Sequence, residues 1–336
     1  MRKETDLDGV KAIAKALLMT AVNQTPYSPM IVQHPFTSTG LIPFPTEMNK
    51  GFQPVDITLN EDNLKIWRES VSQIIDEAEN PYHIYITSTN VMTNMDYYTE
   101  AEKLRDKNVS VGIHWTVSAG KPVCAPDEIK TLVDKEGNFY SYPEFRKRYR
   151  EKMISDNDIA KELKAQYERF VKVCGEPDYW NTHQNTHVDF GVFKLFTDTA
   201  KELGIQKMRS HKRVYIPSSS GKSSMSLGWI AAEPIKRAIL NSWIKYAEKN
   251  GMKSPYGVAL ALRKEDIKNP EYCFLNMKNI NNAVTEYVIH PSTSLDSAFF
   301  GSIGEDRLRE YKQFTSEQQK EILEKNNYIL VNFSNI

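Results

Sequence analysis

Two histidines four residues apart, His183 and His187, lie in the polar segment NTHQNTHVDFG at residues 181–191. Imidazole nitrogens are good ligands for Zn²⁺ and other transition metals, and catalytic metal sites commonly use about three protein ligands with one position open for water. The pair could equally be two ordinary histidines beside a turn, because side chains at i and i+4 share a face in a helix and in a strand. The spacing alone leaves both interpretations open.

The positions of the other histidines favour a shared site. Four of the 7 histidines fall where a β-strand is expected to end, namely His34, His114, His183 and His290. In parallel α/β folds, functional sites form at the carboxyl ends of the strands. We therefore expect these side chains to lie near one another, with a satisfied core histidine as the alternative at each position.

A divalent metal held there would support hydrolysis. It lowers the pKa of bound water towards neutrality, and the resulting nucleophile can attack an amide or an ester. The chain has no G-x-S-x-G nucleophile elbow, and none of its 3 cysteines lies beside a histidine. The Gly-Lys-Ser in SSSGKSSMSLG (218–228) is not a phosphate-binding P-loop, because Ile216 stands where that motif needs a glycine. Metal-assisted hydrolysis is the simplest enzymatic interpretation.

The elements that must position these residues follow an α/β pattern. Short runs of β-forming residues alternate with longer amphipathic runs, which is typical of a parallel sheet covered by helices. Strands are predicted at 29–36, 82–89, 109–117, 206–210, 284–291 and 328–334, and helices at 61–80, 95–108, 158–175, 190–205 and 316–327. The helix at 158–175 ends at Gly175, a usual C-terminal stop.

Composition limits the environment and the partners. The 336 residues are 40% hydrophobic and 26% charged, as in soluble globular proteins, and 43 basic residues balance 43 acidic ones, which argues against a nucleic-acid partner. No apolar run approaches the roughly 18 residues that span a bilayer, and charges interrupt the N-terminal segment, which argues against a secretory signal. Scattered cysteines predict no disulfide framework. We expect a cytoplasmic protein without membrane contact.

Five motifs in order along the chain resemble those of the YdjC-like carbohydrate deacetylases, the family of the chitooligosaccharide deacetylases. Each motif is short, but five in the right order favour this fold over roughly residues 82–336. The matching segments are VGIHWTVSAGKPV (111–123), LVDKEGNF (132–139), ELKAQYERF (162–170) leading to THQNTH (182–187), KMRS with Arg209, and VTEYVIHPS (284–292).

The resemblance implies a distorted (β/α) barrel and one divalent ion, Mg²⁺ or Zn²⁺, held by an aspartate and two histidines. It also implies removal of N-acetyl groups from amino sugars or short chito-oligosaccharides, with metal-bound water as the nucleophile. Carried over by position, His114 is one metal ligand, and the second is His183 or His187. His290 and Arg209 would line the pocket and act on the leaving amine, the developing oxyanion or the sugar.

Two parts of the family pattern are missing. Asn181 and Asn185 replace an aspartate and a histidine ahead of the last histidine, and an asparagine can orient a neighbouring imidazole but brings no charge. The Asp-Asp motif of the first strand also has no counterpart. In one placement Glu61 and Asp62 stand in for this motif; the alternative is that they only cap the next helix. In the other placement His34 stands in for it. With His34 as a ligand the site would be all-histidine and would prefer Zn²⁺.

Aromatic residues beside the expected ligands could bind a small carbohydrate. Trp115 directly follows His114, and an apolar sugar face could stack on its ring. A tryptophan this close to a strand is more often part of the core.

The domain organisation follows from the same resemblance. Residues 1–27 are expected to form an N-terminal helical extension and 28–336 a single barrel domain. The Pro- and Gly-rich stretch 40–56 would be an insertion, either a lid over the barrel mouth or a contact with a second subunit in a homodimer. Three functions remain open: a metal-dependent carbohydrate deacetylase, a degenerate carbohydrate-binding protein of the same fold, and another metal-assisted hydrolase.

Overall fold

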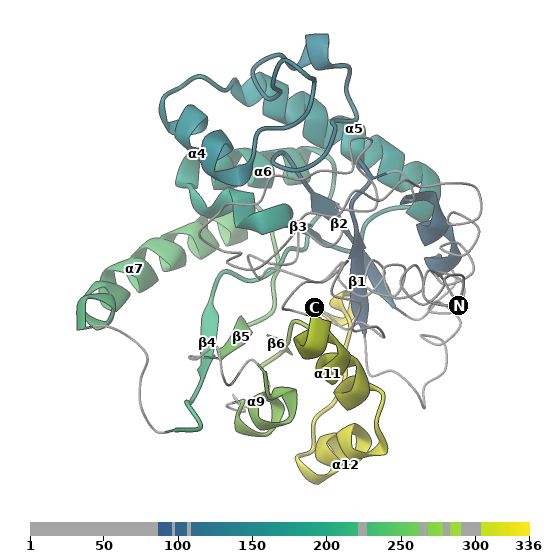
Figure 1. Ribbon diagram of the computed structural model, residues 1–336, viewed down its shortest axis with the longest axis vertical. Coiled ribbons are helices and arrows are strands. Elements are labelled where there is room, and N and C mark those ends of the chain that lie inside the picture. Colours follow the sequence, from purple (N-terminus) through teal and green to yellow (C-terminus); the bar gives the residue numbers. More distant parts are fainter. Residues whose placement is uncertain are drawn as a thin grey trace, which may run out of the picture.

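The structure is a computed structural model (Figure 1), and most of its C-terminal three quarters can be described. Several predictions lie outside the described residues: the strand at 29–36, the helix at 61–80, the extension 1–27, the insertion 40–56, and the side chains of His34, Asp62 and His290. The described ranges are 87–95, 98–105, 109–220, 227–261, 266, 268–277, 283–289 and 304–336.

Parallel strands form two three-stranded sheets in this part of the chain, so the predicted mixed α/β class is confirmed. The first sheet has the order β1 (Ser88–Val91), β2 (Ser110–Trp115) and β3 (Trp180–Thr182). The second has the order β4 (Arg213–Ile216), β5 (Gly257–Ala261) and β6 (Thr285–Glu286).

Isolated parallel bridges join the chain between the two sheets. Trp180 of β3 pairs with Met208, and Lys207 pairs with Lys253 just before β5. The segment 207–216 thus extends from β3 to β5, and the strands follow one another in chain order. Among the described strands β1 and β6 are not paired with each other, so closure into a barrel stays a prediction.

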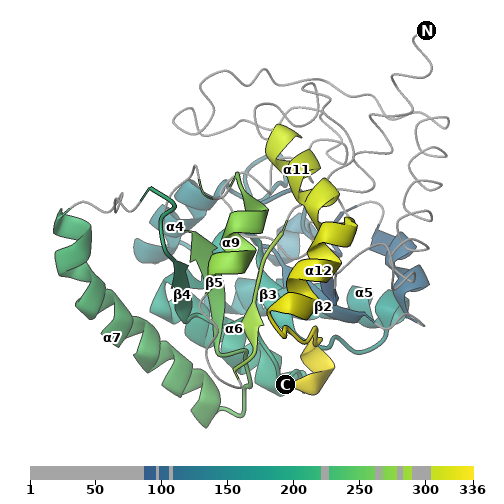
Figure 2. The ribbon, with the colours of Figure 1, turned by 90° about the horizontal axis from the view of Figure 1, so that it is seen from below.

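Helices connect successive strands, as parallel pairing requires. In Figures 1 and 2 they lie outside the strands, and α11 contacts both α9 and α12. Their bounds are α4 (Tyr142–Arg150), α5 (Asp156–Cys174), α6 (Phe190–Glu202), α7 (Leu227–Lys249), α9 (Pro270–Asn276), α11 (Gly304–Phe314) and α12 (Glu317–Lys325), with 3₁₀ turns η1 (Tyr98–Leu104), η2 (Pro126–Glu128), η3 (His183–Val188) and η5 (Phe333–Asn335).

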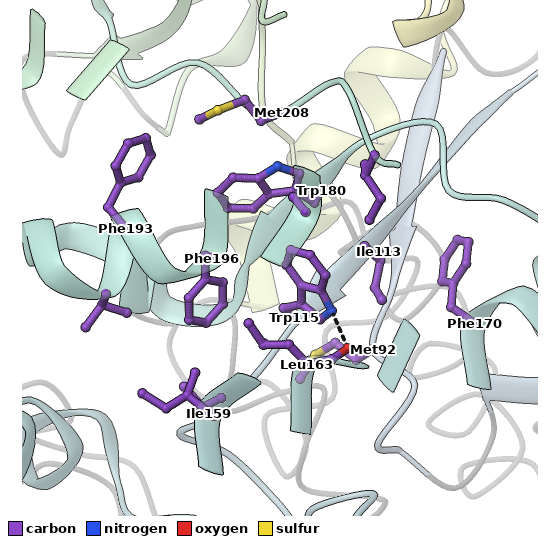
Figure 3. Close-up of a cluster of buried hydrophobic side chains, with 14 of the residues drawn as sticks. Met92, Ile113, Trp115, Ile159, Leu163, Phe170, Trp180, Phe193, Phe196 and Met208 are labelled. Atoms are coloured by element: carbon purple, nitrogen blue, oxygen red, sulfur yellow. Dashed lines mark hydrogen bonds between the residues drawn. The ribbon is translucent and has the colours of Figure 1, made fainter. Parts of the chain in front are cut away.

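The larger hydrophobic core lies between the first sheet and helices α5 and α6 (Figure 3). Trp115 and Trp180, from neighbouring strands, have ring centroids 5.6 Å apart, and Phe196 of α6 meets Trp115 edge-on at 5.8 Å. The Trp115 indole donates a hydrogen bond to the Leu163 carbonyl of α5 at 3.1 Å. A smaller core packs α9, α11 and α12 around Phe274. The larger core fixes β2, which carries His114, and β3, which His183 directly follows.

The predicted elements mostly match the structure within a few residues. Helices α5, α6 and α12 and strands β2 and β6 lie inside their predicted ranges or within two residues of them. The caps agree with the sequence: the Ser155 hydroxyl accepts from the Asn157 amide at the start of α5, and Gly175 ends it with φ 77°. The three cysteines are free, as expected. Within the ranges that can be described, no helix combines the length and apolarity that a bilayer crossing needs.

The helix predicted at 95–108 is a shorter 3₁₀ helix, η1. One predicted element is wrong in type. The range predicted as a strand at 328–334 forms no strand and ends in η5. Side-chain contacts hold it instead: the Phe333 ring stacks on Tyr179 at 3.7 Å, and the Lys207 ammonium donates to the Phe333 carbonyl at 2.7 Å.

Candidate functional site

His114 is oriented by a side chain of the neighbouring strand. In the register of β2 with β3, His114 lies opposite Asn181, and its Nδ1 atom is 2.6 Å from the Asn181 Oδ1 atom. The amide oxygen can only accept, so Nδ1 carries the proton and the lone pair of the neutral ring is on Nε2. A histidine fixed in this way presents Nε2 to a metal ion or to a substrate.

His183 follows β3 directly and lies beside His114. The two ring centroids are 5.5 Å apart with an interplanar angle of 82°, and each residue is 2% exposed. Metal–nitrogen bonds of about 2.1 Å put the centroids of two imidazoles on one tetrahedral ion roughly 5 Å apart. The spacing of His114 and His183 fits two ligands of a common ion.

A tight turn separates His183 from His187. Gln184 and Asn185 both have left-handed backbones, with φ 55° and 53°, which is uncommon outside glycine. The Gln184 side-chain oxygen accepts from the Ser118 hydroxyl at 2.9 Å. Because the turn interrupts regular geometry, the two histidines contact different neighbours despite their spacing of four.

His187 pairs with His211, which the sequence analysis did not single out. Their ring centroids are 4.4 Å apart, and the Nδ1 atom of His187 is hydrogen-bonded to the Thr182 hydroxyl. His211 also contacts Phe193 of α6 at 4.8 Å. A signal existed: the strand predicted at 206–210 ends one residue before His211, so the strand-end criterion applied to His114 and His183 would have found it.

Arg209 forms a buried ion pair with Glu286 of β6. Its Nε and Nη2 atoms lie 2.7 and 2.6 Å from the same Glu286 oxygen, and the two side chains are 4% and 6% exposed. The Arg209 amide also donates to the Trp180 carbonyl at 3.2 Å, which ties this segment to β3. The sequence predicted Arg209 as a pocket residue but gave no role to Glu286.

Burial keeps all four imidazoles neutral. It lowers the pKa of His114 to about 3 and that of His211 to about 4, and it takes the pKa of His183 and His187 well below the usual value. The positive charge of Arg209 lowers the pKa of His114, His187 and His211 further. Neutral imidazole is the form that binds metal ions.

The described part of a metal site is incomplete. Within the ranges given above, no three His, Cys, Asp or Glu side chains converge on one point. The predicted completing residues, His34 and Asp62, lie outside those ranges, and so does His290. His114 and His183 would therefore supply only part of a ligand set.

Trp115 lies apart from the imidazoles. Adjacent residues of a strand point to opposite faces, so Trp115 faces away from the His114 side of the sheet. It is 0% exposed within the larger core, and Trp180 lies in the same cluster. The structure does not bring Trp115 to the histidines.

Comparisons with known proteins agree with the motif pattern. Residues 85–325 match the sequence profile of a family described as YdjC-like protein. The chain is 32% identical over 154 residues to a carbohydrate deacetylase of Clostridium beijerinckii, covering 44% of this chain and 58% of that protein. It is 26% identical over 176 residues to a chitooligosaccharide deacetylase of Citrobacter koseri, covering 49% and 68%. The chain thus spans little more than half of the Clostridium protein.

A solved structure shares the fold. The crystal structure of a proposed cellobiose-phosphate cleavage protein of Enterococcus faecalis V583 superposes with a TM-score of 0.54 at 19% identity, over 75% of this chain and 88% of that one. At this identity the likeness concerns the arrangement of strands and helices.

Proposed function

The chain belongs to the YdjC-like protein family, and we propose that it is a metal-dependent hydrolase that removes N-acetyl groups from amino sugars or short chito-oligosaccharides. The observation that carries the proposal is the His114–His183 pair, two buried neutral imidazoles with ring centroids 5.5 Å apart. The deacetylases of Clostridium beijerinckii and Citrobacter koseri supply the substrate class.

In this proposal His114 and His183 hold a divalent ion, and Asp62 or His34 completes the ligand set. Such an ion supplies Lewis-acid activation for hydrolysis of an amide. Asn181 keeps the proton on Nδ1 of His114, so that Nε2 is free to act as a ligand. Two neutral imidazoles favour Zn²⁺ over Mg²⁺, which prefers carboxylate and water oxygens.

Arg209 is the proposed source of positive charge for the transition state. Its guanidinium is held by Glu286, and its charge acts on His114 and His187. A fixed cation beside a developing oxyanion stabilises it without reorganisation. His290 is proposed, as in the sequence analysis, to handle the proton of the leaving amine.

The architecture that we propose is a distorted (β/α) barrel. The chain-order succession of parallel strands and the bridges at Trp180 and Lys207 support it. The strand predicted at 29–36 would complete the series. A cytoplasmic location and a homodimer formed through 40–56 remain predictions.

A second candidate function is carbohydrate binding without catalysis. It is favoured by Asn181, which stands where the family has an acid, and by the lack of a carboxylate beside the His114–His183 pair in the described ranges. Metal content and activity together separate the two functions.

The test is elemental mass spectrometry of purified wild type and of the His114→Ala, His183→Ala and His187→Ala variants. We expect about one equivalent of a divalent ion in wild type and in His187→Ala, and loss of the ion in the other two. Acetate release from N-acetylglucosamine oligomers is then measured. If wild type binds no metal ion after incubation with Zn²⁺ and with Mg²⁺, the proposal of a metal-dependent enzyme is refuted. Binding of metal and sugar without acetate release would favour carbohydrate binding without catalysis.

A further inference from the structure

The segment that follows β2, residues 116–124, is anchored to helix α5 by two buried side chains. The Nε2 atom of Gln166 donates to the Thr116 carbonyl at 2.6 Å, and its Oε1 atom accepts from the Thr116 amide at 3.1 Å. The carboxylate of Glu162 accepts from two backbone amides near the other end of the segment, at 2.8 and 2.9 Å. Because both side chains are fully buried, water does not compete for these bonds. The loop that comes after His114 is therefore fixed at both ends.

This fixed segment contacts the turn that carries His183. Its Ser118 is buried, and the Ser118 hydroxyl donates to the Oε1 atom of Gln184 at 2.9 Å. Gln184 comes directly after His183 in the chain, and Ser118 comes shortly after His114. The hydrogen bond between Ser118 and Gln184 thus joins the two segments that carry the two proposed metal ligands.

The turn needs such a contact because its backbone conformation is unfavourable. Gln184 has φ 55° and ψ 18°, and Asn185 has φ 53° and ψ 40°. Residues other than glycine rarely take this left-handed conformation, because the Cβ atom comes too close to a carbonyl oxygen. Two in succession persist only where the surrounding contacts outweigh the cost. Without the bond to Ser118 the turn can relax to a commoner backbone conformation, and the direction of His183 changes with it.

We propose that Ser118 and Gln184 are positioning residues for His183. Their hydrogen bond holds the left-handed turn in the form that places His183 against His114, with ring centroids 5.5 Å apart. Asn181 orients the other imidazole of the pair from the neighbouring strand. The inference rests on the proposed function, because it treats both histidines as ligands of one ion. Side chains that orient metal ligands typically contribute about 10–100-fold to metal affinity.

The experiment compares the full-length wild type with Ser118→Ala, Gln184→Ala and the double variant. Ser155→Ala is the matched control, because it removes the hydroxyl that caps α5 and leaves the bond at the turn in place. The first measurement uses the metal-free protein: the rate at which diethyl pyrocarbonate modifies His183, located by mass spectrometry. His183 is buried in wild type. We expect this rate to rise severalfold in the three variants that lack the bond and to stay at the wild-type value in Ser155→Ala.

The second measurement is metal binding. The Kd for Zn²⁺ is obtained by competition with a fluorescent chelator, and the visible absorption of the Co²⁺-loaded protein reports the number and geometry of its ligands. We expect the Zn²⁺ Kd to rise about tenfold in Ser118→Ala and in Gln184→Ala, with a changed Co²⁺ spectrum, and neither to change in Ser155→Ala. The double variant should lose no more affinity than either single variant, because both single changes remove the same hydrogen bond.

An unchanged rate of His183 modification and an unchanged Zn²⁺ Kd in folded Ser118→Ala and Gln184→Ala would overturn the inference, and so would losses of affinity that add up in the double variant. If Ser118→Ala does not fold, Gln184→Ala decides, because Gln184 is only half-buried.

The proposed function and the positioning role can fail separately. If wild type binds no metal ion, the proposed function is refuted. Faster modification of His183 in the metal-free variants would then still support the role of Ser118 and Gln184, and an unchanged rate would refute it. Acetate release by wild type, with variants that match it in both measurements, would refute the positioning role alone.

Discussion

The Nδ1 atom of His114 lies 2.6 Å from the Oδ1 atom of Asn181 on the neighbouring strand. This contact preserves the geometry of a carboxylate–histidine pair but carries no negative charge. The contact fixes the His114 ring in the orientation that the proposed metal ligand needs, while its pKa stays at about 3 because burial outweighs the hydrogen bond. An aspartate at position 181 would both orient the His114 ring and increase its basicity, whereas Asn181 only orients it.

Asn181→Asp is expected to raise the pKa of His114. The new carboxylate would stabilise the imidazolium, and an adjacent opposite charge shifts a pKa by about 1–3 units. Zn²⁺ should also bind more tightly, by about tenfold or more, because the charge of an orienting group increases ligand basicity. The measurements are NMR titration of the histidine ring and competition with a fluorescent chelator. Asn181→Leu is the matched control, with weaker Zn²⁺ binding expected; equal affinities for all three proteins would contradict the role of Asn181.

Acid is expected to destabilise the metal-free protein. The folded pKa values of His114 and His211 are lowered to about 3 and about 4, whereas the unfolded chain titrates near 6.5. Below pH 6.5 the unfolded state binds more protons, so stability is fully present above that pH and decreases as the pH falls towards 4. Each histidine contributes up to about 1.4 kcal/mol per pH unit.

Urea denaturation of the metal-free protein between pH 7.5 and 4.5 measures this effect. The midpoint should fall with pH in wild type and fall less steeply in His211→Phe. If the urea midpoint depends on pH equally in the two proteins, His211 takes up a proton as readily in the folded state as in the unfolded state.

The Arg209–Glu286 pair is expected to be sensitive to the loss of one partner. Glu286→Gln removes the buried carboxylate that pairs with the Arg209 charge, which costs about 3–5 kcal/mol of unfolding free energy. The double variant Arg209→Met, Glu286→Leu should recover most of that loss, because apolar side chains of similar volume avoid the desolvation of both charges. Urea denaturation measures both variants, and a smaller cost in the single variant than in the double would contradict a buried pair.

The sequence predicted the elements whose signals are local. The apolar periodicity of 158–175 and 190–205 correctly predicted helices α5 and α6, and the hydrophobic run around His114 correctly predicted strand β2. Placing histidines at strand ends correctly brought His114 and His183 together. The helix and strand predictions need only the chain within a few residues of the position in question, whereas the meeting of His114 and His183 also needs the parallel pairing of β2 with β3.

The misses depend on contacts that local sequence does not contain. The range 328–334 has the β-forming residues of a strand, but stacking of Phe333 on Tyr179 holds it in another form. The left-handed turn at Gln184 sends His187 to His211, which spacing alone cannot reveal. The pairing of Arg209 with Glu286 joins residues 77 positions apart.

Trp115 is expected to stabilise the folded protein and to take no part in sugar binding. Trp115→Phe removes the hydrogen bond to the Leu163 carbonyl and leaves unfilled space in the core, which should cost about 2 kcal/mol of unfolding free energy. Because the ring faces away from His114, the KM for an N-acetylated disaccharide should stay within about twofold of the wild-type value. Thermal denaturation and steady-state kinetics measure the two effects on the same preparation. A large rise in KM without a loss of stability would place Trp115 at the sugar and contradict its position in the core.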